Sequence, residues 1–402
     1  MSSSTEFIRF IGHTAFSRRL TIATLLGRPV HISKIRVSSP TSPGLAPHHI
    51  SFLRLLEAVT NGSSIQISFT GTTITYRPGL ITGTVAGEGA TEGDVIVHNI
   101  PESNTRGVTY YLLPLCLLAP FSKAHMNVRF SGPGVITSAT EEGDVSVDTF
   151  RTAIIPLFDL FGIPPARIEI RVLQRSCPGP EGRGGGGCVE LRFASQVRLP
   201  RTLHLHRDPG RIKRIRGVAY STGVSASNNS RMIQAAREKL KFFCADIHVA
   251  AQYDQAPLVA AGKEGEKRRL GIGFGLSLVA ESSTAGIFYS ADMVTPSTGN
   301  TVPEEIGRNC VSQLLESIKL GGCVSHVSSP IVLVLMSMGS EDVGRLRIAE
   351  GVFATHNHVR LARDLRMFGA HPWALRDAGN KAHDIIVTVK GAGVGNVGRK
   401  MA

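Results

Sequence analysis

The sequence lacks a long apolar run, so it predicts no membrane-spanning helix. Its most apolar stretch covers Tyr110–Phe121 and contains Pro114 and Pro120. This is about a dozen residues, whereas a spanning helix needs about 20. The first ten residues, MSSSTEFIRF, also lack the apolar core and the small-residue cleavage pattern of a signal peptide. No basic amphipathic helix stands out either, so we expect no membrane partner.

Cysteine is scarce, and its spacing matches no metal-binding pattern. The chain has six cysteines among 402 residues, and none of them forms a CxxC pair. Scattered cysteines in a long chain without a signal peptide are typical of reduced thiols in an intracellular protein. We therefore expect no zinc site.

Acidic residues are outnumbered by basic ones, which indicates a phosphate-rich partner. The chain has 31 Asp and Glu against 44 Lys and Arg, a formal net charge of +13. Such a charge favours polyanions, above all RNA, at physiological salt. The hydrophobic fraction of 42% is ordinary for a soluble globular protein, and 402 residues are enough for two domains.

Helix–break–strand units recur along the chain and predict an α/β core built from similar subdomains. The predicted helices cover residues 48–59, 109–118, 147–161 and 304–318, and the β-rich runs after them cover 64–69, 127–130, 167–173 and 330–336. Between about Leu199 and Gly299 the order changes to a basic strand, a helix at 229–243 and two β-rich runs at 272–280 and 284–289. This order predicts an inserted small α/β domain at 199–299, with residues 1–198 and 300–402 forming the large domain.

A glycine-rich stretch, Pro178–Gly187, is the first candidate for anion binding. It ends in four consecutive glycines, which let a backbone approach a phosphate closely. No Lys-Ser or Lys-Thr pair follows, so the stretch is not a P-loop. A structural hairpin or crossover is the alternative interpretation.

The run RIKRIRG, residues 211–217, is the second candidate. If the run is a strand, its cations appear on both faces, so it cannot be buried on both sides. Either it lies at a sheet edge, where cations are common, or its cations meet an acidic partner. RNA or an acidic protein surface is the favoured partner. The RNA-binding candidates are Arg211, Lys213, Arg214 and Arg216.

Two His-x-His pairs and a C-terminal glycine run give weak indications of a metal site and of a dinucleotide site. His204 and His206, like His356 and His358, would share one face of a strand and could bind a metal together. No third ligand is identifiable, so unliganded surface histidines are favoured. Residues 391–398 follow a predicted strand at 384–390, but too few residues remain for the helix of a dinucleotide site. We expect neither a metal nor a cofactor.

A helix with an apolar line on one side and charged residues on the other is predicted at Val359–Phe368, and three hypotheses apply to it. Arg360 and Asp364 are four residues apart, the ordinary geometry of a surface ion pair. The polar side could instead dock a partner protein or RNA. It could also cleave RNA, with Asp364 as the base and Arg363 and Arg366 stabilising the phosphorane. Neighbouring cations would depress the pKa of Asp364 and make it a poor base, so docking is favoured over cleavage.

Short motifs spread from Phe16 to Lys390 resemble the RNA 3′-terminal phosphate cyclase family, and more closely its cyclase-like branch in eukaryotic ribosome assembly. They include Arg18-Arg19-Leu20, Gly27–Val30, Pro43-Gly44-Leu45, Ser51–Leu56, Thr70–Thr73, Pro78-Gly79-Leu80, Gly184–Gly187, Asp208–Gly217, Gly273–Glu281, Gly307–Cys310 and Gly321–Val324. The resemblance implies an α/β (α+β) fold: a large domain of repeated βαβ-type units with an inserted smaller α/β domain.

The resemblance also implies that cyclase chemistry is lost. True cyclases have an EGGGQ-like segment near the N-terminus, whereas this chain has Gly12–Phe16, without the acid or the glycine run. The histidine that true cyclases adenylate aligns with Ala354, and His356, two residues away, is the only plausible substitute. A shift of two residues moves a nucleophile by several ångströms, out of in-line geometry.

By resemblance, we expect a non-catalytic factor in small (40S) ribosomal subunit assembly in the nucleus and nucleolus. It would support early pre-18S rRNA processing within the small-subunit processome and bind a GTPase. The partner-binding candidates are Arg360, Arg363, Asp364 and Arg366. The alternatives are a pre-rRNA endonuclease that uses Arg363, Asp364 and Arg366, and a residual cyclase that uses His356.

Overall fold

One βαβαββ unit occurs three times in the chain. The structure, a computed structural model, describes residues 6–84, 91–92, 94–180, 183–194, 200–260, 267–379 and 383–393. Three of its sheets share the same pattern, in which the first two strands are parallel and a hairpin adds antiparallel strands to the second. We call the three units repeats 1, 2 and 3.

Repeats 1 and 2 are continuous in sequence. Repeat 1 consists of β1 (Ile8–Ile11), α1 (Phe16–Leu26), β2 (Val30–Ser33), α2 (Pro47–Ala58), β4 (Ser64–Ile67) and β5 (Ile74–Arg77), and a small ladder joins β3 (Thr60–Asn61) to β6 (Leu80–Ile81). Repeat 2 consists of β8 (Val95–Asn99), α3 (Thr109–Leu118), η1 (Ala119–Phe121), β9 (Met126–Ser131), α4 (Val147–Thr149), η2 (Phe150–Ile154), η3 (Ile155–Phe161), η4 (Pro165–Arg167), β10 (Ile168–Gln174) and β11 (Cys188–Phe193), and β7 (Thr91–Glu92) extends its sheet.

Repeat 3 is interrupted after its first strand. It consists of β12 (His204–Leu205), α7 (Ser329–Met338), β19 (Val343–Ala349), α8 (Glu350–Phe353), α9 (His356–Met367), β20 (Ala374–Asp377) and β21 (Asp384–Lys390). The insertion between β12 and α7 consists of β13 (Ile212–Thr222), α5 (Ser227–Leu240), β14 (Ile247–Asp254), β15 (Leu258–Ala260), β16 (Lys267–Arg269), β17 (Gly273–Ser282), β18 (Phe288–Val294) and α6 (Pro303–Leu320). The predicted fold class, repeated βαβ-type units with an inserted smaller α/β domain, is confirmed.

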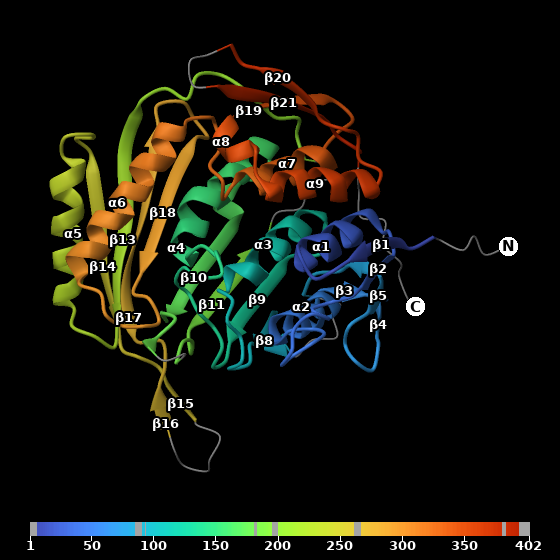
Figure 1. The fold of residues 1–402 in the computed structure, drawn as a ribbon, viewed down its shortest axis with the longest axis horizontal. Coiled ribbons are helices and arrows are strands. Elements are labelled where there is room, and N and C mark those ends of the chain that lie inside the picture. Colours follow the sequence, from blue (N-terminus) through green and yellow to red (C-terminus); the bar gives the residue numbers. More distant parts are fainter. Residues whose placement is uncertain are drawn as a thin grey trace.

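The inserted unit is a separate four-stranded sheet with two helices on it. Its strand order is β14-β13-β17-β18, and α5 and α6 pack against each other and against these strands. Figure 1 shows this sheet and its helices on one side of the molecule, with β15–β16 extending from one end. The predicted division at residues 199 and 299 stays a prediction, but the packing places both ends of the insertion further along the chain. The strand β12 pairs with β19 of repeat 3, whereas α6 covers β17 and β18.

A buried carboxylate joins the insertion to repeat 2. Asp292 on β18 accepts hydrogen bonds from the backbone N–H and hydroxyl of Ser146 and from the hydroxyls of Thr149 and Ser277, at 2.5–2.9 Å. Because Ser146 and Thr149 belong to the α4 region and Ser277 to β17, these bonds fix how the two units sit against each other.

Two predicted elements differ from the structure. Residues 330–336, predicted as a β-rich run, belong to the helix α7, in which all residues but Pro330 are buried. A short apolar run cannot be distinguished from a buried helix by its periodicity, which explains the error. The predicted helix at 147–161 is present but changes from α-helix to π-helix and then 3-10 helix, because Pro156 has no N–H to continue the ladder.

Candidate anion-binding site

A cavity of about 1070 Å³ lies where the three repeats meet. Its wall includes the first turns of five helices: α1, α3 and α7, the first helices of the three repeats, and also α2 and α9. Each helix N-terminus carries unsatisfied N–H groups and a partial positive charge. Their convergence makes this cavity, which we call the central cavity, electrostatically suited to an anion.

Arg18 on α1 is a charged cavity residue with free hydrogen-bonding capacity. Its Nη1 donates to Asn357 Oδ1 at 2.8 Å, and its Nη2 lies 4.0 Å from Asp364. The Nε and Nη2 atoms are buried and have no hydrogen-bond partner among the described residues. Burial lowers the pKa of Arg18 to about 10, so the guanidinium stays charged at neutral pH. Buried donors without partners are costly, and an oxyanion in the cavity would satisfy them.

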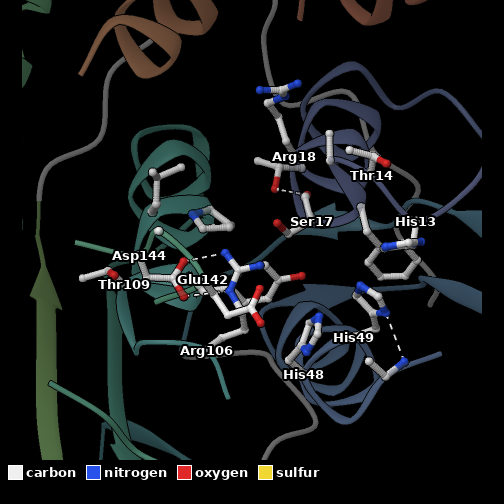
Figure 2. A pocket seen from close by; sticks show the side chains of 18 of the residues that line it. His13, Thr14, Ser17, Arg18, His48, His49, Arg106, Thr109, Glu142 and Asp144 are labelled. Carbon is white, nitrogen blue, oxygen red and sulfur yellow. Dashed lines mark hydrogen bonds and ion pairs between the residues drawn. The ribbon is translucent and has the colours of Figure 1, made fainter. Parts of the chain in front are cut away.

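Arg106 lines the same cavity but is already neutralised. It donates two hydrogen bonds to the carboxylate of Asp144, at 2.7 and 2.5 Å, and lies 4.4 Å above the ring of Tyr110. Figure 2 shows this pair next to Glu142, on the side of the cavity opposite His13. The remaining cationic groups of the wall are Arg36, which bonds Ser42, and Arg360 on α9.

Three histidines lie together at one side of the central cavity (Figure 2). The ring centroids of His48 and His49 lie 4.2 Å apart, and those of His13 and His49 lie 6.0 Å apart. Burial, reinforced by neighbouring cations, lowers the pKa of His48 to about 4 and that of His49 to about 2. These two imidazoles are therefore neutral at pH 7, and Nδ1 of His49 accepts a hydrogen bond from the Ala46 N–H at 3.1 Å. The described residues contain no cluster of three or more His, Cys, Asp or Glu that could hold a metal ion.

His356, the alternative nucleophile, does not line the central cavity. Asn357 and Arg360 are the α9 residues that line it, whereas His356 is exposed and lines a second, smaller hollow. His358 is buried, and its two ring nitrogens lie 2.8 Å from the hydroxyls of Ser329 and Thr355. The predicted strand geometry for His356 and His358 is wrong, because both lie on a helix, and His358 has no nitrogen left for a metal.

Asp364 is not part of a surface ion pair with Arg360. Its carboxylate is 2% exposed and accepts two hydrogen bonds, both 3.0 Å long, from Nε and Nη2 of Arg19 on α1. The Arg19 guanidinium in turn lies 4.3 Å from the centroid of the Phe10 ring. The i,i+4 spacing was misleading because α1 packs against this side of α9. Buried and bonded in this way, Asp364 is poorly placed to take a proton from RNA.

The second hollow, which we call the α9 groove, measures about 390 Å³ and lies between β1 and α9. Its rim combines exposed apolar side chains with cations. The apolar members are Ile11, Val359 and Met367, and the cations are Arg9, Arg360 and Arg363. Arg366 is exposed on the same helix. A rim of this composition fits an acidic, partly apolar protein segment, and the assignment of Arg360, Arg363 and Arg366 to partner binding stays a prediction.

The basic strand is internal, not at an edge. β13 lies between β14 and β17, and two of its cations pair within the chain: Arg214 with Glu281 at 2.6 Å, and Arg216 with both oxygens of Asp246 at 2.8 Å. Arg211 and Lys213 are exposed and form no ion pair with a described carboxylate. The acidic partner required by the sequence argument is therefore supplied largely by neighbouring strands and loops.

The glycine-rich stretch is, in its described part, the hairpin connection between the antiparallel strands β10 and β11. The N–H groups of Gly185, Gly186 and Gly187 donate to the carbonyls of Cys177, Pro133 and Val135. With these donors used inside the chain, the stretch offers no cradle for a phosphate, and Glu181 and Gly182 lie outside the described residues.

Sequence reasoning missed the central cavity, although Arg18 was among the family motifs. Its members come from residues 13–21, 36–49, 103–117, 142–154, 326–334 and 357–360, and no local pattern links these segments. The recurring unit was the available signal, since a threefold repeat places the first turns of equivalent helices at a common centre.

Comparison with known proteins gives consistent matches over most of the chain. The family model of RNA 3′-terminal phosphate cyclase matches residues 8–370. An RNA 3′-terminal phosphate cyclase-like protein of Mus musculus is 38% identical over 349 residues, which are 86% of this chain and 84% of the relative. The rRNA processing protein RCL1 of Saccharomyces cerevisiae is 35% identical over 404 residues and 100% of both chains. The rRNA processing protein rcl1 of Schizosaccharomyces pombe is 34% identical over 367 residues, 90% of each chain.

Proposed function

Because the chain belongs to the RNA 3′-terminal phosphate cyclase family, we propose that it is a cyclase-like factor that supports rRNA processing without cyclase chemistry. The family resemblance noted in the sequence is confirmed by these matches. The finer proposal is a role in early pre-18S rRNA processing within the small-subunit processome, in the nucleolus. The names of the yeast relatives support the coarser part, rRNA processing.

The observation that carries the proposal is the composition of the central cavity. It keeps an anion-binding character, with five helix N-termini and the unpartnered donors of Arg18. However, the α9 side chains that face it are an amide and a guanidinium, Asn357 and Arg360. Neither is a nucleophile that forms an adenylate. Such a cavity is suited to holding an oxyanion, for example an RNA phosphate, and not to transferring one.

The covalent step of the ancestral chemistry is directly testable. Purified protein is incubated with α-labelled ATP and Mg²⁺ and run on a denaturing gel beside an active cyclase. We expect label on the cyclase and none on this protein. A label that disappears in His356→Ala would show that the residual cyclase hypothesis is right and that His356 reaches the nucleotide.

The role in processing is tested in cells that encode the protein. Depletion should lower 18S rRNA and accumulate its precursors while the large-subunit rRNA changes less. Wild-type protein should restore the 18S level. Unchanged 18S precursors after depletion would contradict the proposal.

A GTPase partner is proposed to dock in the α9 groove through Arg360 and Arg363. We expect Arg363→Glu to lose co-purification of a GTPase from cell extract, because the substitution reverses a charge on the groove's rim. The matched control is Arg376→Glu, which reverses an exposed charge on β20. Loss of the GTPase in both variants, or in neither, would reject this docking site.

The endonuclease alternative has little support in the geometry. Its proposed base, Asp364, gives both oxygens to Arg19 and is almost fully buried. Cleavage of a pre-rRNA fragment by purified protein, abolished by a substitution at Asp364 that leaves the protein folded, would be needed to revive it.

A further inference from the structure

Two fully or largely exposed phenylalanines follow α5 on the inserted unit. Phe242 is 85% exposed and Phe243 is 45% exposed, in the turn that connects α5 to β14. Large apolar side chains at such exposure contribute little buried area to the hydrophobic core. Neither belongs to the central cavity or to the α9 groove.

One cation contacts the Phe242 ring, and others lie on the adjacent segments. The Nζ of Lys241 lies 4.8 Å from the centroid of the Phe242 ring. The start of β13 is adjacent, since Cys244 Sγ contacts the Lys213 carbonyl at 3.7 Å and the N–H of Ile215 donates to the Asp246 carbonyl at 2.8 Å. Lys213 therefore lies beside the turn. We call Lys213, Arg237, Lys241, Phe242 and Phe243 the aromatic–basic patch.

The patch has an excess of positive charge. Asp246 is held by the bidentate bond from Arg216, so these two charges cancel. The Arg216 hydrogen bond also lowers the pKa of Asp246, which keeps the carboxylate ionised. Lys213, Arg237 and Lys241 are exposed and form no ion pair with a described carboxylate, and the neighbouring acid is Glu238, which accepts a hydrogen bond from Gln234.

Exposed aromatic rings interleaved with unpaired cations match the requirements of one kind of ligand. Single-stranded nucleic acid offers phosphates for the cations and unstacked bases for the rings. We propose that the aromatic–basic patch binds single-stranded RNA, with a base stacked on Phe242 and the backbone held by Lys213 and Lys241. The inference rests on the proposed function in taking RNA as the polyanion, and it assigns a second contact far along the chain from the central cavity.

This assignment revises the RNA-binding prediction made from the sequence. Of the four cations of the basic run, Lys213 belongs to the patch, whereas Arg214 and Arg216 are used in ion pairs within the chain. The aromatic members and Lys241 come from a different segment, which only the pairing of β13 with β14 brings alongside.

The test uses the full-length protein and a fluorescein-labelled oligouridylate of roughly a dozen nucleotides, a length that suits a single binding face. Binding is followed by fluorescence anisotropy. Phe242→Ala should weaken binding about tenfold, the loss expected for one stacked base. Phe242→Trp should keep the wild-type affinity, and Lys241→Gln should reduce the salt dependence by about 0.7 in the log–log slope.

A matched control is available on the other side of the molecule. Phe69, in the turn between β4 and β5, is at least as exposed as Phe242, so Phe69→Ala removes an equivalent apolar surface. This variant should bind the oligouridylate like wild type. Because both side chains are exposed, neither substitution should affect folding, and a thermal melt checks this.

Four results would overturn the proposal, three from the variants and a peptide and one from the wild-type protein. The first is an affinity of Phe242→Ala within twofold of wild type. The second is equal weakening in Phe69→Ala. The third is a polyglutamate peptide whose binding depends on Phe242 when oligouridylate binding does not, which would assign the patch to an acidic protein. A wild-type protein that restores 18S rRNA in cells but binds no oligouridylate would reject this inference and leave the proposed function standing.

Discussion

The buried ion pair between Asp364 and Arg19 allows a decisive test of what α9 does. The two side chains are 3% and 9% exposed, and the pair joins α9 of repeat 3 to α1 of repeat 1. Removing one member of such a pair leaves the other charge buried without a partner, which costs about 3–5 kcal/mol. We therefore expect Asp364→Ala to lower the free energy of unfolding by that amount, as measured by urea denaturation.

The matched variants separate structure from chemistry. Replacing both members, as in the double variant Arg19→Met with Asp364→Leu, removes the pair without leaving a charge and should recover most of the lost stability. Arg363→Ala, at an exposed position of the same helix, should change the free energy of unfolding by no more than about 0.5 kcal/mol.

The same variants decide the endonuclease question in cells. The double variant has no carboxylate at position 364, so it cannot use that group as a base. If it restores 18S rRNA where Asp364→Ala fails, the carboxylate acts through stability. An Asp364→Ala protein as stable as wild type would refute the reasoning, because the ion pair would then contribute nothing to the packing of α1 on α9.

Three further outcomes follow from other buried groups. Burial raises the pKa of Asp292, so the stability contributed by this group is complete below its unfolded pKa and is lost as pH rises through the folded value. In urea titrations, the free energy of unfolding of wild type should therefore fall relative to that of Asp292→Asn as pH rises above the unfolded pKa. Burial lowers the pKa of His98 from 6.5 to about 4, so wild type should lose stability as pH falls through that interval, and His98→Asn should lose less; equal slopes would argue against a neutral buried imidazole. Gly185→Ala would place a Cβ within 1.9 Å of the Pro133 carbonyl at a φ of +107°. It should therefore lower the free energy of unfolding by several kcal/mol, roughly the upper range for single substitutions. Gly143→Ala, also at positive φ but in open space, should cost only about 1 kcal/mol in the same denaturation assay.

Local patterns predicted most elements but not their pairing. The helix at 304–318 is found as α6, because Pro303 and two acids open it and Ile306, Cys310 and Leu314 form one buried stripe. The run 330–336 was predicted as strand because β-branched and large apolar residues satisfy both a buried strand and a buried helix.

Charge patterns predicted that the charged side chains have partners of opposite charge, but not which residues these partners are. For the basic run, the sequence required an acidic partner, and Glu281 and Asp246 of the same chain supply it for Arg214 and Arg216. For α9, the spacing of Arg360 and Asp364 suggested a surface pair, whereas the carboxylate bonds Arg19, which is 345 residues away in sequence. Such long-range pairs leave no local periodicity, so no sequence window contains them.

The sequence by itself determined the family, the α/β class and the repeated construction with an insertion. These properties depend on the order of the residues and on their local periodicity, and this periodicity follows the backbone geometry of helices and strands. Only the tertiary structure decided that five helix N-termini meet at one cavity, that Asp364 is buried while His356 is exposed, and that Lys213 lies beside the turn that carries Phe242. Sites of this kind arise from packing between distant segments, where burial and neighbouring charge, and not sequence spacing, set what each side chain can do.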